Sequence, residues 1–77
     1  MDIKLADVTL HVHESLDKGR RDEIETKLRA LEGVVSVHNP DDRPHLTVVE
    51  YNPEKTSSQS LLESVRAGGI HAQLIGI

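Results

Sequence analysis

Histidine is the residue type in this sequence that is best suited to chemistry. The chain has 5 histidines among 77 residues and no cysteine. His11 and His13 are separated by one residue, so in a β-strand both imidazoles lie on one face with their Cα atoms about 7 Å apart. Neutral imidazole binds Zn, Ni, Cu(II) and Fe, whereas Cu(I) prefers soft thiolates. The pair therefore predicts a site for a divalent transition metal, the alternative being ordinary polar residues with no cofactor.

The strands that must position these histidines are predicted from short segments that are either apolar or alternate between apolar and polar residues. Residues 3–13 alternate between apolar and polar side chains, which predicts a strand with one buried face. A β-branched segment at 34–37 and a second segment at 45–51 flank the turn residues Asn39–Pro44, which predicts a hairpin. A last strand is predicted over 70–77.

Two helices are predicted between these strands. Ile24, Leu28 and Leu31 form one apolar stripe, which is preceded by Ser15 and stopped by Gly33. Thr56 and Gln59 resemble a capping box ahead of a second stripe, which Gly68 and Gly69 close. The stripe residues of the second helix are Leu61, Leu62 and Val65.

The order strand, helix, strand, strand, helix, strand predicts an α+β fold, the ferredoxin-like βαββαβ sandwich. In this fold a four-stranded antiparallel sheet, in the order fourth, first, third, second, carries both helices on one face. Residues 1–77 are too few for two cores, so we expect a single domain.

This topology places all the histidines at one pole of the sheet. We therefore predict that His11, His13 and His71, with His45, bind a metal ion, whereas His38 only decorates the sheet. Metal must displace protons from imidazole, so affinity should fall steeply below about pH 6. Glu14 follows His13, but neighbouring strand residues point to opposite faces, so we do not expect these two side chains to pair.

Haem is an alternative ligand for the same histidines. His11, His13 or His71 would bind the iron axially. An apolar platform would have to cover the ring, and Ile75 and Ile77 have the parity to contribute to it. The chain has no Phe or Trp to complete such a platform.

Three segments of the sequence are LEGVVSV at 31–37, VEYNP at 49–53 and LESVRAGGIHA at 62–72. Together they resemble the heavy-metal-associated domain family in residue types and spacing over nearly the whole chain. The resemblance implies a small cytoplasmic metal carrier, or the matching module of a metal-pumping ATPase. Members hold metal on two thiolates of an M-x-C-x-x-C loop, and the corresponding positions here are Ser15, Asp17 and Arg20. The thiolate chemistry of the family is therefore absent.

Composition argues against several other classes of protein. The net charge is -4 without a run of basic residues, so nucleic acid is not an expected partner. Apolar stretches are too short for a membrane span or a signal peptide, so we expect a cytoplasmic protein. No nucleophile motif is present, so we do not expect an enzyme. The alternative to metal binding is an interaction module whose open sheet face pairs with a partner protein or a second copy.

Overall fold

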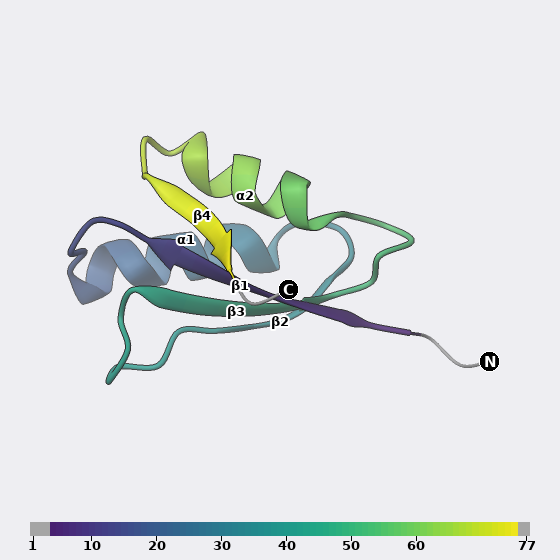
Figure 1. Cartoon of the computed structure of the whole chain (residues 1–77), viewed down its shortest axis with the longest axis horizontal. Coiled ribbons are helices and arrows are strands. Elements are labelled where there is room, and N and C mark those ends of the chain that lie inside the picture. Colours follow the sequence, from purple (N-terminus) through teal and green to yellow (C-terminus); the bar gives the residue numbers. More distant parts are fainter. Residues whose placement is uncertain (1–3, 76–77) are drawn as a thin grey trace.

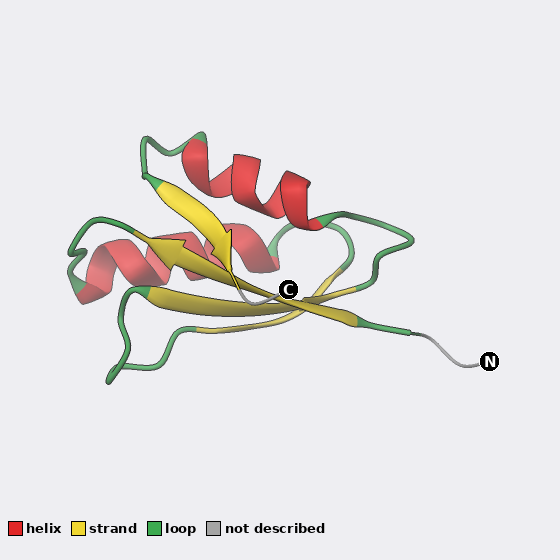
Figure 2. Ribbon diagram, viewed as in Figure 1, coloured by secondary structure: helices red, strands yellow, loops and turns green. Residues whose placement is uncertain are grey.

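The computed structural model describes residues 4–75, which form six elements (Figure 1). In chain order these are β1 (Ala6–Val12), α1 (Lys18–Arg29), β2 (Val34–His38), β3 (Leu46–Tyr51), α2 (Ser58–Arg66) and β4 (Ala72–Ile75). The sheet has the order β2-β3-β1-β4, and every neighbouring pair is antiparallel. The predicted ferredoxin-like sandwich is therefore confirmed (Figure 2).

The predicted alternation along β1 matches the burial of its side chains. Val8, Leu10 and Val12 are buried, whereas Thr9 and His11 on the other face are partly exposed. The buried face packs on the helices in one apolar cluster, because each helix presents its stripe to the sheet. The opposite face stays open, and it carries His11 between Leu46 of β3 and Gln73 of β4.

The helix boundaries differ from the predicted ones by a few residues. Asp17, not Ser15, caps α1 by accepting a 2.8 Å hydrogen bond from the backbone N–H of Arg20. Ser57, not Thr56, caps α2 in the same way through Ser60. The capping oxygen must reach the N–H three residues later, and several polar residues compete for that place in each segment.

Helix α1 ends at Arg29, earlier than predicted. Leu31, predicted to lie in the helix, and Gly33, predicted to stop it, both lie in the following turn. Leu31 still packs against the core. Gly33 has a φ of +94°, and Gly69 before β4 has a φ of +81°. Both turns use a backbone conformation that side chains disfavour.

Replacing Gly33 by alanine should destabilise the fold more than replacing Gly69. A Cβ at Gly33 would lie 2.9 Å from Cβ of Lys55 and 3.1 Å from Cγ2 of Thr56, whereas one at Gly69 would meet nothing within 4 Å. We expect Gly69→Ala to lower the free energy of unfolding by about 1 kcal/mol, from backbone strain alone, and Gly33→Ala by about 2–3 kcal/mol. Urea denaturation measures both values, and equal losses would contradict the steric argument.

Residues 4–75 contain no helix that combines the length and apolar character needed to cross a bilayer.

Candidate metal centre

The predicted histidines lie at one pole of the sheet, at or next to strand ends. His11 lies within β1, and His13 follows the last residue of that strand. His45 and His71 directly precede β3 and β4, and His38 is the last residue of β2. Because β1 and β2 run antiparallel to β3 and β4, the ends of the first two strands and the starts of the last two lie at the same pole of the sheet.

Three of the imidazoles contact one another in a row. The ring centroids of His11 and His13 are 5.1 Å apart, and those of His11 and His45 are 6.0 Å apart. We call His13, His11 and His45 the histidine row. Two imidazoles bound to one tetrahedral zinc, with Zn–N bonds of about 2.0–2.1 Å, have centroids about 5 Å apart. The spacing of His11 and His13 matches that value.

A backbone hydrogen bond orients the imidazole of His45. Its Nδ1 lies 2.9 Å from the carbonyl oxygen of Val12. A carbonyl only accepts, so Nδ1 carries the proton and Nε2 keeps its lone pair. This is the arrangement that metal-bound histidines commonly show.

The imidazole of His11 has an unmet hydrogen-bonding group. Its Nδ1 is buried and has no hydrogen-bond partner among the described residues. A buried polar atom without a partner destabilises a fold by about 1–3 kcal/mol. Rotation of the ring toward a metal ion would give this nitrogen a partner, so the donor set fits an imidazole-bound ion.

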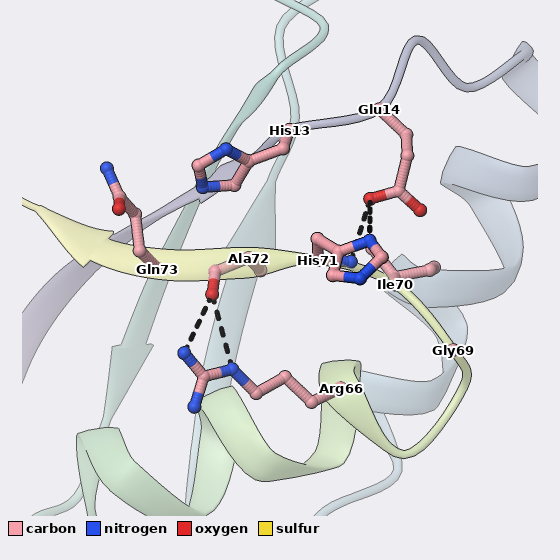
Figure 3. Close-up of a pocket in the computed structure, with 8 residues that line it drawn as sticks. All are labelled: His13, Glu14, Arg66, Gly69, Ile70, His71, Ala72 and Gln73. Atoms are coloured by element: carbon pink, nitrogen blue, oxygen red, sulfur yellow. Dashed lines mark hydrogen bonds and ion pairs between the residues drawn. The ribbon is translucent and has the colours of Figure 1, made fainter.

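Glu14 contacts both the backbone and the ring of His71. The Oε1 atom of Glu14 accepts a 2.7 Å hydrogen bond from the backbone N–H of His71 and lies 3.3 Å from its Nδ1 (Figure 3). His71 shares with His13 an open pocket of about 680 Å³ between β4 and the end of α2. Sequence reasoning missed this contact, because Glu14 and His71 are 57 residues apart and no local pattern relates them.

The four predicted ligands do not form a ready-made coordination shell. Within residues 4–75, no group of three or more His, Cys, Asp or Glu side chains is arranged to hold a metal ion. The ring contacts join His11 to His13 and to His45, and His71 contacts Glu14. Rotation of exposed side chains, His13 in particular, is needed before three imidazoles meet.

The positions predicted to match the family's cysteines have other roles here. Asp17 caps α1, and Arg20 forms an ion pair with Glu23 at 3.4 Å. Asp41 in the β2–β3 hairpin lies 3.5 Å from Arg21. Neither the start of α1 nor the β2–β3 hairpin supplies a soft thiolate ligand.

Solved structures share the fold of this chain, although comparisons of its sequence alone find no relative. No protein-family model matches the sequence, and no curated protein matches it. Oxidized MerP from Ralstonia metallidurans CH34 has 22% identity and a TM-score of 0.84, over 95% of this chain and 100% of MerP. The N-terminal domain of a potential copper-translocating P-type ATPase from Bacillus subtilis, in the Cu(I)-loaded state, has 25% identity and a TM-score of 0.85, over 95% of this chain and 90% of that one.

The yeast copper transporter domain, solved in apo and Cu(I)-loaded states, has 26% identity and a TM-score of 0.80, over 91% of this chain and 94% of that domain. The chain therefore has the fold of heavy-metal-associated domains, but it has no cysteine. Its structural neighbours include a copper-binding domain of a P-type ATPase and a domain of a potential copper-translocating P-type ATPase.

Proposed function

We propose that this chain, which has the fold of heavy-metal-associated domains, binds a divalent transition-metal ion through imidazoles in place of thiolates. His11 and His13 form the core of the site, His45 is the third ligand, and His71 joins from the neighbouring pocket. The observation that carries the proposal is the 5.1 Å spacing of the His11 and His13 rings, which the stacked His45 extends. A second support is the fold, whose neighbours bind copper.

The donor set determines which ions this site would prefer. Imidazole is a ligand of intermediate softness, so Zn, Ni, Cu(II) and Fe suit it better than Cu(I). Arg20, in the first turn of α1, stands at a position that the resemblance matches to a family cysteine, and a fixed positive charge there disfavours a cation. The proposed ion therefore lies on the sheet side of the pole. A carrier of this kind, without enzymatic activity, would work in the cytoplasm with a protein partner that supplies or receives the ion.

The test is a titration of untagged, metal-free protein with Zn(II), Ni(II), Cu(II) and haem in turn, followed by two-dimensional NMR of the imidazoles. We expect one of the divalent ions to perturb His11, His13 and His45 saturably at one equivalent. Protons compete with a metal ion for the imidazole nitrogens, so affinity should fall steeply between pH 7.5 and 5.5. Affinity that is flat over this range, or rings that ignore every probe, would refute the proposal.

A second candidate function is self-association through the open face of the sheet. The observation that favours it is apolar exposure, because Val48 on this face is 38% exposed and Val35 on the edge strand β2 is 55% exposed. A dimer across the open face would cover His11 and exclude metal. Sedimentation at two protein concentrations distinguishes the two functions.

Haem is the remaining alternative, and the titration includes it. Val48 and Ile75 both lie opposite Thr9 in the sheet, so they supply an apolar strip beside His11. Ile77, the other predicted platform residue, lies outside the described residues. Axial ligation by His11, His13 or His71 would show as a haem absorbance shift.

A further inference from the structure

We infer that Glu14 is a positioning residue that presents His71 as an additional ligand beside the histidine row. This inference rests on the proposed metal-binding function. It starts from a backbone contact: the N–H of His13 donates a 2.8 Å hydrogen bond to the carbonyl of His71. The pairing continues the β1–β4 register beyond Val12 and Ala72. His13 and His71 are therefore cross-strand neighbours.

Cross-strand neighbours carry their side chains on the same face of a sheet. Directly opposed residues have Cβ atoms about 4.5–5.5 Å apart, which two imidazoles can span around one ion. Both side chains line the same pocket, at the open edge of β4 (Figure 3). An ion bound to His13 thus has His71 as its nearest imidazole on the adjacent strand.

Glu14 controls both the backbone and the ring of His71. One carboxylate oxygen accepts from the backbone N–H at 2.7 Å and lies 3.3 Å from Nδ1. A carboxylate beside Nδ1 favours the tautomer that carries the proton there, because two lone pairs would otherwise repel. Nε2 then holds the lone pair that a metal needs. A carboxylate on the far nitrogen also raises the basicity of a ligating imidazole.

The side chain of His71 is 85% exposed. Little packing restricts it, so the contact with Glu14 is what orders it. Ordering a ring before the ion arrives reduces the entropy lost on binding. The effect is specific to Glu14, because Arg66, the other charged residue apart from the histidines at this pocket, donates to the carbonyl of Ala72.

The experiment compares wild type with Glu14→Ala, Glu14→Gln and His71→Ala, using Zn(II) as the probe. Loss of a group that orients a metal ligand weakens affinity about 10- to 100-fold. We expect this loss for Glu14→Ala, a smaller one for Glu14→Gln, whose amide oxygen still accepts, and no additional loss when Glu14→Ala is added to His71→Ala. Glu54→Ala, in the exposed turn after β3, is the matched control.

A metal-free measurement separates positioning from general structural effects. Long-range ¹H–¹⁵N NMR should show His71 with its proton on Nδ1 in wild type and shifted toward Nε2 in Glu14→Ala. Wild type that binds Zn(II) while Glu14→Ala binds equally well would overturn this inference and leave the proposed function standing. Wild type that binds neither Zn(II) nor the other ions would overturn both, and an unchanged tautomer in Glu14→Ala would overturn the positioning role by itself.

Discussion

The double variant His11→Asn, His13→Asn should bind Zn(II) or Ni(II) at least about 100-fold more weakly than wild type. Altering groups that merely orient metal ligands weakens affinity about 10- to 100-fold, so the loss of two ligands should exceed that range. The two rings are the closest histidine pair in the row, at 5.1 Å. Isothermal titration calorimetry at pH 7.5 measures the change.

The control for this experiment is His38→Asn. His38 lies at the end of β2 opposite Val48, and β3 separates it from β1. We expect His38→Asn to bind Zn(II) or Ni(II) with the same affinity as wild type. If His38→Asn weakens binding as much as the double variant, the ion is bound nonspecifically by exposed histidines, and the site at His11 and His13 is wrong. Circular dichroism of each variant confirms that the sheet is retained.

The proposed site differs from the loop site of the family in what holds its ligands. His11 lies in a central strand, paired with β3 on one side and β4 on the other. A ligand on such a strand is held more rigidly than one on a loop. Meanwhile Asp17 and Arg20 stabilise the start of α1. Among the proposed donors, His11 lies within a strand, and the other three lie directly next to strand ends.

The fold could be predicted because its determinants are local. The alternation at Val8, Leu10 and Val12 specifies which face of β1 is buried, and the turn residues before His45 specify the hairpin. The handedness of the crossovers then permits few arrangements of four strands and two helices. Placing the histidines at one pole followed from strand direction alone.

The side-chain geometry of the site could not be predicted in the same way. Whether His45 stacks on His11 depends on a hydrogen bond to Val12, which is 33 residues away in sequence. The contact of Glu14 with His71 depends on how the chain turns after β1. Period-2 reasoning applies to Glu14 only while the strand continues, and β1 ends at Val12. The sequence therefore predicts that the histidines share one pole, but their rotamers and long-range contacts, which decide whether a coordination shell forms, cannot be predicted from it.

Leu28→Ala should be among the most destabilising single substitutions in the chain. Leu28 is fully buried at 0% exposure and is the one buried residue of α1. Removing a buried leucine side chain lowers the free energy of unfolding by about 2–5 kcal/mol, depending on how far the cavity collapses. A domain of this size has a total stability of roughly 4–12 kcal/mol, so the variant should lose a large share of it. Urea denaturation followed by circular dichroism measures the loss.

Two further variants make the Leu28 experiment decisive. Val35→Ala removes methyl groups from a side chain that is 55% exposed, so its stability should change by less than about 0.5 kcal/mol. Leu28→Met conserves volume and should lose less than about 1.5 kcal/mol, which keeps the site testable if the alanine variant does not fold. A loss below about 1 kcal/mol in Leu28→Ala would contradict the packing described here. Because α1 is joined to β1 through the segment that carries Glu14, loosening this helix should also weaken the ordering of His71.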